Sequence, residues 1–198
     1  DKGIALSLRA IGDAYLGANM RQQAIDFYIE AFNVLNTLEG ADHLKIHISP
    51  NLILTLLKIR ETDKALVYLK QLEVLFDKYP TTSTLFYVSI CRAYYYVVTN
   101  QPDKALIYIT EATKANSEHD YPYMRFVLDY LHASYYKQNK QYDRALEKYG
   151  NLIKEINPAY SPNQHIQLNL QQAQLLSKLG QTCLLYTSDA ADERSSVD

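Results

Sequence analysis

Tryptophan is absent from this chain of 198 residues, and cysteine, glycine and proline are scarce, at two, six and six residues. Two cysteines, Cys91 and Cys183, are too few for a disulfide framework or a cysteine-rich metal site. The glycines and prolines stand between long stretches in which apolar residues recur at helical spacing, and this pattern predicts an all-α protein. No run of about 18 apolar residues occurs, so we expect no membrane-spanning helix within the chain.

Excess charge of one sign and catalytic motifs are also lacking. The net charge is −2, which provides no basic surface for a phosphate backbone, so we expect no direct binding of nucleic acid. Glycine-rich phosphate loops, His-Glu-x-x-His and Cys-x-x-Cys do not occur. His43 and His47 have the spacing of metal ligands on a helix, but without further ligands nearby they favour a solvated helix start. We therefore expect no enzyme activity, no cofactor and no metal.

An internal repeat is the main feature that the sequence does contain. Four alanines, each opening an amphipathic stretch, lie 41, 40 and 40 residues apart, at Ala24, Ala65, Ala105 and Ala145. Defined positions before and after each anchoring Ala hold matching side chains, and the offsets of four and seven place them on one helical face. Twelve residues before Ala stand Gly12, Ile53, Ala93 and Ala133; nine before, Tyr15, Leu56, Tyr96 and Tyr136; four after, Tyr28, Leu69, Ile109 and Tyr149; and seven after, Ala31, Leu72, Ala112 and Leu152.

Each copy predicts two helices joined by a turn around Asn19, Asn100 or Asn139, because small residues at a helix crossing let two backbones approach closely. Pro102 marks the start of one second helix. Pro50 falls inside a predicted first helix, which we expect to start near Pro50 or to kink there. The expected pairs are 3–17 with 21–38, 44–59 with 62–79, 82–98 with 102–116 and 119–138 with 142–157, followed by a fifth first helix at 162–179.

The pattern resembles the tetratricopeptide repeat, and it is complete in the first copy, as Leu8, Ile11, Gly12, Tyr15, Ala24, Tyr28 and Ala31. This resemblance covers residues 3 to about 182 and implies a right-handed α-solenoid of antiparallel helix pairs. The period of about 40 exceeds the 34 residues of the standard repeat, so longer helices or loops must absorb the difference. An ordinary helical bundle with accidental spacing is the alternative.

The resemblance also implies a binding surface, because first helices line the concave groove in this family. Tyrosine, with 18 copies in the chain, suits peptide recognition by its flat apolar ring and polar tip, although packing between repeats is the alternative for each one. Asp13 stands where the family's carboxylate clamp needs Asn, which argues against chaperone C-termini as ligands. The candidate partner-binding residues are Arg9, Asp13, His47, Tyr87, Tyr94, Tyr130 and Lys137.

Two packing predictions concern the third copy. Of the three consecutive tyrosines Tyr94, Tyr95 and Tyr96, the register assigns Tyr96 to the core, so the other two must point elsewhere. Cys91 has apolar and aromatic neighbours, which favours a buried and inert thiol.

The repeat breaks off after Thr182. The register requires an anchoring Ala near position 185, where Leu185 stands. Residues 183–198 resemble the translated read-through of a sequencing-library adapter, and a natural polar tail is the alternative. We therefore expect a repeat domain over 1–182, with four helix pairs and a truncated fifth, followed by a non-native tail over 183–198. The natural chain is then expected to continue beyond Thr182.

The leading functional hypothesis is a module that binds a protein or peptide in its groove. Residues 104–108 and 172–180 resemble the sensor regions of bacterial signalling proteins, in which tetratricopeptide units precede a membrane helix and a histidine kinase, or a helix-turn-helix regulator. That resemblance implies a sensory region on the periplasmic side of a membrane, whereas one free thiol fits a cytoplasmic setting equally well. A scaffold or assembly factor without signalling output is the alternative.

Overall fold

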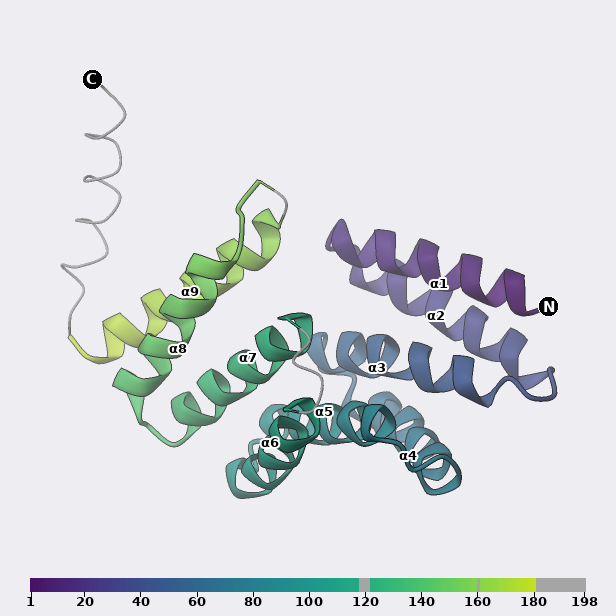
Figure 1. The fold of residues 1–198 in the computed structure, drawn as a ribbon. Coiled ribbons are helices and arrows are strands. Elements are labelled where there is room, and N and C mark those ends of the chain that lie inside the picture. Colours follow the sequence, from purple (N-terminus) through teal and green to yellow (C-terminus); the bar gives the residue numbers. More distant parts are fainter. Residues whose placement is uncertain (118–121, 160, 181–198) are drawn as a thin grey trace. The chain divides into compact units, whose positions relative to one another are not determined.

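The computed structural model describes residues 1–117, 122–159 and 161–180, and within these ranges it contains nine α-helices and no β-strand (Figure 1). The all-α prediction is confirmed, and every predicted helix begins and ends within three residues of an observed one. The helices are α1 (Lys2–Gly17), α2 (Arg21–Asn36), α3 (Asp42–Lys58), α4 (Thr62–Lys78), α5 (Thr82–Val98), α6 (Pro102–Asn116), α7 (Pro122–Gln138), α8 (Tyr142–Glu155) and α9 (Pro162–Lys178).

The chain divides into two compact units, one ending at Leu131 and the other beginning at His132. The boundary falls inside α7, where the sequence repeat continues without interruption. In the first unit, α1 with α2, α3 with α4, and α5 with α6 form antiparallel hairpins with short turns (Figure 1). These hairpins are tetratricopeptide-like helix pairs repeated about every 40 residues.

The core follows the register of the anchoring alanines. Ala24, Ala65, Ala105 and Ala145 are completely buried, as are most side chains twelve residues before them and four and seven residues after them. Gly12 shows why a small residue stands twelve positions before the anchor in the first pair, since an added Cβ would lie 2.7 Å from Cε1 of the Tyr28 ring. Close approach of α1 and α2 is therefore built into the first pair, whereas the second pair has the larger Ile53 at this position.

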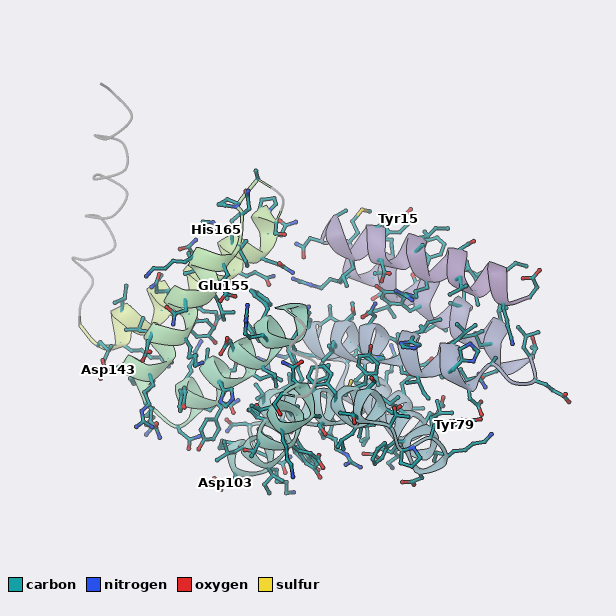
Figure 2. All side chains as sticks on the ribbon, viewed as in Figure 1. Tyr15, Tyr79, Asp103, Asp143, Glu155 and His165 are labelled. Atoms are coloured by element: carbon teal, nitrogen blue, oxygen red, sulfur yellow. The ribbon has the colours of Figure 1, made fainter. Side chains whose placement is uncertain are left out.

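The tyrosines nine residues before the anchors depart from the predicted core. Tyr15, labelled on α1 in Figure 2, and Tyr96 are only half-buried. Each stacks on an aromatic ring of the second helix, with 5.3 Å between the ring centroids of Tyr15 and Phe27 and 5.5 Å between those of Tyr96 and Tyr108. Tyr94, by contrast, is 8% exposed. The assignment of Tyr96 rather than Tyr94 to the core was wrong, because the ring at this offset lies at the rim of the helix pair, where stacking covers one of its faces.

The four turns that join the two helices of each pair share one left-handed backbone conformation, always at the same position relative to the anchoring Ala. The residue five before each anchoring Ala has a left-handed φ, with values of 60° at Asn19, 66° at Arg60, 56° at Asn100 and 59° at Lys140. The next residue donates its N–H to the carbonyl five residues back, as in Met20 to Tyr15 at 2.9 Å, which is the hydrogen bond of a Schellman motif. In the fourth turn Lys140, and not the neighbouring Asn139, takes the left-handed position.

This geometry predicts that Lys140→Gly stabilises the protein. A side chain with a Cβ costs about 1–2 kcal/mol in the left-handed region, whereas Gly adopts it freely. Gly also raises the entropy of the unfolded chain, and this offsets part of the gain. We therefore expect a net increase of about 0.5–1 kcal/mol in the free energy of unfolding, measured by thermal unfolding. Asn100→Gly is the control and should change less, since Asn tolerates this conformation. A destabilised Lys140→Gly would contradict the prediction.

Helix α3 begins at Asp42 and contains Pro50. The expectation that this helix starts near Pro50 was therefore wrong. Proline has no N–H, so residue 50 donates no hydrogen bond to the carbonyl one turn earlier. Ile46, Ile48 and Pro50 are buried, and the Ser49 hydroxyl donates to the Lys45 carbonyl at 2.6 Å. Apolar burial of this half of α3 therefore keeps it helical despite the lost hydrogen bond.

Candidate functional site

The candidate residues in the first unit all lie on the first helices of their pairs, and we call Arg9, Asp13, His47, Tyr87, Tyr94 and Tyr130 the first-helix row. They occupy α1, α3, α5 and α7. The structure brings them together as three contacts, namely Arg9 with Asp13, His47 with Tyr87, and Tyr94 with Tyr130. Two of these contacts join the first helices of successive pairs.

Asp13 joins three helices. Its Oδ1 accepts a hydrogen bond from the Tyr28 hydroxyl of α2 at 2.7 Å and from Nδ2 of Asn51 in α3 at 2.9 Å. Its Oδ2 lies 3.4 Å from Nε of Arg9, one turn earlier in α1. Sequence reasoning missed Tyr28 and Asn51 as partners, although a hydroxyl at a predicted core position is a signal, because it needs an acceptor.

His47 and Tyr87 occupy the same register position in successive pairs, and their rings meet edge to face with centroids 5.8 Å apart. Partial desolvation of the ring, which packs against Tyr87, lowers the pKa of His47 below its ordinary value of 6.5, and the positive charges of Arg9 and His43 lower it further. His47 is therefore mostly neutral at pH 7, and it presents an uncharged ring beside the Arg9 guanidinium.

This environment predicts two measurable effects. NMR titration should show a pKa for His47 below 6.5, and Arg9→Gln should raise it, because the substitution removes a nearby positive charge. Since the unfolded chain takes up this proton at a higher pH than the folded protein, His47 makes stability fall as the pH drops below about 6.5. His47→Gln should flatten that part of the stability profile, and an unchanged profile would contradict the assignment.

Tyr94 and Tyr130 stack nearly parallel, with ring centroids 6.1 Å apart and planes inclined by 11°. Tyr130 is half-buried, whereas little of Tyr94 is exposed. Tyr94 therefore presents its ring to Tyr130 more than to solvent, and within this stack Tyr130 is the side chain more accessible to a ligand.

Lys137 belongs to the second unit, where it contacts α9. Its ammonium Nζ donates to Oε1 of Gln171 at 2.6 Å and to Oε1 of Gln174 at 3.1 Å. Partial burial lowers the pKa of Lys137, and the charge of Lys178 lowers it further. The two glutamines were not predicted, and they direct this cation toward packing within the unit.

Three polar or reactive side chains of α5, namely Ser89, Cys91 and Arg92, serve packing. Cys91 is fully buried, as predicted, and burial raises the pKa of its thiol. Arg92 donates from Nε to Glu73 at 2.7 Å and covers the Tyr108 ring, while the Ser89 hydroxyl donates to Glu111 at 2.7 Å. No group of three His, Cys, Asp or Glu side chains within the described ranges is placed to hold a metal ion.

The first-helix row leaves chemically distinct groups accessible. The Arg9 side chain is 38% exposed, His47 is exposed, and Tyr87 and Tyr130 are half-buried. His47, Tyr87 and Tyr130 each contact a ring of a neighbouring first helix, and Arg9 pairs with Asp13 in its own helix. A ligand would therefore meet side chains whose positions are already restricted. The row offers one cation, one carboxylate, ring edges and hydroxyls.

No protein-family model and no curated protein matches the chain. Among solved structures, one titled "MamA MSR-1 C2" aligns over 96% of this chain and 98% of its own, with 15% sequence identity and a TM-score of 0.44. A likeness at that level carries no argument about function. Assignment to the tetratricopeptide-like all-α repeat class rests on the helix pairs and their register. No helix within the described ranges combines the length and apolar composition needed to cross a bilayer.

Proposed function

We propose that this chain is a non-catalytic repeat module that binds a protein or peptide along its first-helix row. The observation that carries the proposal is the combination of exposure and restraint at Arg9, His47 and Tyr87. Rings and guanidinium groups held in place before binding lose little conformational entropy when a ligand arrives, which is typical of residues that dominate binding energy. The pKa of His47 is lowered, which favours its uncharged ring at pH 7, so the charged groups that this part of the row offers a ligand are the paired Arg9 and Asp13.

Selection of displayed peptides against the immobilised full chain, followed by affinity measurement with soluble peptide, tests this surface. We expect His47→Ala with Tyr87→Ala to weaken the selected peptides by about tenfold or more. The matched control is Val67→Ala with Val74→Ala, two exposed positions on α4, which should change affinity by less than about twofold. Equal effects of the two double variants, at equal unfolding midpoints, would contradict binding along the row.

The finer proposal is that the module is the sensory region of a bacterial signalling protein, with a histidine kinase or a helix-turn-helix regulator encoded downstream. It is supported by the resemblance of residues 104–108 and 172–180 to such sensor regions. A periplasmic setting follows for the kinase form. The alternative is a scaffold or assembly factor, in which the same surface binds a partner without signalling output.

Sequencing genomic DNA across the codons for Thr182 and Cys183, and upstream of Asp1, decides between these two forms. The sensor proposal expects an apolar stretch of about 20 residues and a kinase domain, or a DNA-binding domain, in the same reading frame. A frame that ends after one capping helix would support the scaffold. A frame that reads through residues 183–198 and stops at Asp198 would contradict both the adapter origin of the tail and the sensor proposal.

A further inference from the structure

Positive charge is concentrated in the second unit. Residues 132–180 contain six Lys or Arg and three Asp or Glu, whereas residues 1–131 contain thirteen and fifteen. Four of the six cations stand where α7 ends, in the turn to α8, in the first turn of α8 and at the end of α9 (Figure 1). We call these four side chains, Lys137, Lys140, Arg144 and Lys178, the second-unit basic cluster.

Neutral groups hold two of these cations in place. The Lys178 ammonium lies 5.5 Å from the centroid of the Tyr142 ring at the start of α8, and the Arg144 guanidinium lies 5.7 Å from that of the Tyr136 ring in α7. Arg144 also donates from Nη1 to Oε1 of Gln141 at 3.0 Å. These contacts restrain the two side chains without neutralising their charges.

Lys137 brings a further ammonium close to Lys178. The position eight residues before the anchor is apolar in the three earlier copies, as Leu16, Leu57 and Val97. The packing of a helix pair therefore does not require a cation there. The Nζ of Lys137 donates to Oε1 of Gln171 and of Gln174, and both acceptors are uncharged. Desolvation lowers the pKa of Lys137 and the charge of Lys178 lowers it further, so the unit holds two like charges close together at an electrostatic cost.

Carboxylates do not offset these charges in the described part of the second unit. Within residues 132–159 and 161–180, none of the four cations forms an ion pair. The second pair provides the comparison, because its turn has cations at the register positions of Lys140 and Arg144, namely Arg60 and Lys64. There Glu61 lies 3.3 Å from the Lys64 ammonium, whereas the fourth pair has Gln141 at the position of Glu61.

An open hollow of about 490 Å³ adjoins the cluster, and it is lined by Lys140, Gln141, Tyr142, Asp143 and Arg144. Asp143, labelled in Figure 2, is the one carboxylate among these lining residues. The Tyr142 ring joins the hollow to Lys178. Volumes of about 300–1,000 Å³ are typical of pockets for small ligands, so this hollow has room for a few peptide side chains.

We propose that the second-unit basic cluster binds an acidic peptide segment of a partner protein, whose Asp or Glu carboxylates pair with its four cations. Such pairing offsets the repulsion between Lys137 and Lys178 and adds charge-assisted hydrogen bonds to Arg144. A phosphate backbone fits less well, because it needs basic side chains along an extended surface, whereas α8 continues with Glu147 and Glu155. The cluster shares no residue with the first-helix row, so this proposal is independent of the proposed function.

Fluorescence anisotropy with a labelled octaglutamate peptide, at low ionic strength, tests the cluster in the full chain. Lys137→Gln with Lys178→Gln should weaken binding by about tenfold or more, because two cations that pair with the peptide are lost. The matched control is Lys70→Gln with Lys114→Gln, which removes two exposed cations from α4 and α6 and should weaken binding by less than about twofold. Asp143→Asn should strengthen binding by about twofold, because it removes a carboxylate that repels the peptide.

A second double variant keeps the proposal falsifiable, because Lys137 also joins α7 to α9. Lys140→Gln with Arg144→Gln changes two exposed side chains, and it should weaken octaglutamate binding by about tenfold at an unchanged unfolding midpoint. An original chain that does not bind octaglutamate, or equal effects of the cluster variants and the control, would overturn the proposal. Tighter binding of a uridine octanucleotide, with the same dependence on the cluster, would overturn the assignment to an acidic peptide.

Discussion

Replacing Gly12 with Ala should destabilise the protein by about 1–3 kcal/mol, although the same change in a helix interior normally stabilises by about 1 kcal/mol. A Cβ at residue 12 would lie 2.7 and 2.8 Å from two carbons of the Tyr28 ring, far inside van der Waals contact. The ring is completely buried and its hydroxyl is held by Asp13, so it has little freedom to move aside. Helix α1 must then shift away from α2, and unfolding in denaturant measures the cost.

Gly17→Ala provides the matched control in the same helix, since a Cβ there meets nothing within 4 Å. It should leave stability unchanged or raise it by up to about 1 kcal/mol. The fourth pair has Ala133 and Tyr149 at the corresponding positions, both buried, so an Ala opposite a Tyr is possible when the two helices lie farther apart.

Tyr28→Leu removes the ring that the new Cβ would meet, so it should recover part of the stability lost in the Gly12→Ala background. A Gly12→Ala variant as stable as Gly17→Ala would refute the close-approach argument.

Removing the Asp13 carboxylate should have the second large effect. Asp13→Ala takes away the acceptor shared by the Tyr28 hydroxyl and the Asn51 amide, which join α2 and α3 to α1. Hydrogen bonds to a charged acceptor contribute about 1.5–3 kcal/mol, and a buried hydroxyl that loses its acceptor adds a desolvation cost. We expect a loss of about 2–3 kcal/mol in the free energy of unfolding, measured in denaturant.

Two variants separate this hydrogen bond from other effects at the position. Asp13→Asn keeps an oxygen acceptor and should cost less than about 1 kcal/mol. In a Tyr28→Phe background, Asp13→Ala should cost less than in the original protein, by a coupling energy of about 1–2 kcal/mol. Additive effects would show that the carboxylate acts on stability through something other than the Tyr28 hydroxyl.

Much of the fold could be predicted because it depends on local and periodic information. A helix needs a continuous apolar face and a stop signal, and both recur here every 40 or 41 residues around Ala24, Ala65, Ala105 and Ala145. Four copies of one pattern reinforce one another, so the helix limits and the anchoring core positions followed from spacing alone. Pro102 shows the same locality, since the first turn of a helix tolerates a residue without an N–H.

The candidate site was only partly accessible to the same reasoning. The register placed Arg9, His47 and Tyr87 on first helices, but it could not show that His47 meets Tyr87, or that Asn51 reaches Asp13. Such contacts join residues about 40 positions apart, and they depend on how far one helix is shifted and rotated against the next. A change of one helical turn would replace every partner, while the sequence periodicity would stay the same.

The sequence by itself therefore determined the class of protein, the repeat period, the helices and the small residues at which paired helices cross. Only the tertiary structure decided that Tyr94 rather than Tyr96 is buried, that Lys140 takes the left-handed turn position, and that α3 continues through Pro50. The physical reason is the range of the forces involved. Helix formation and capping are settled within a few residues, whereas burial, stacking and shared hydrogen bonds depend on the distance between helices that meet only after folding.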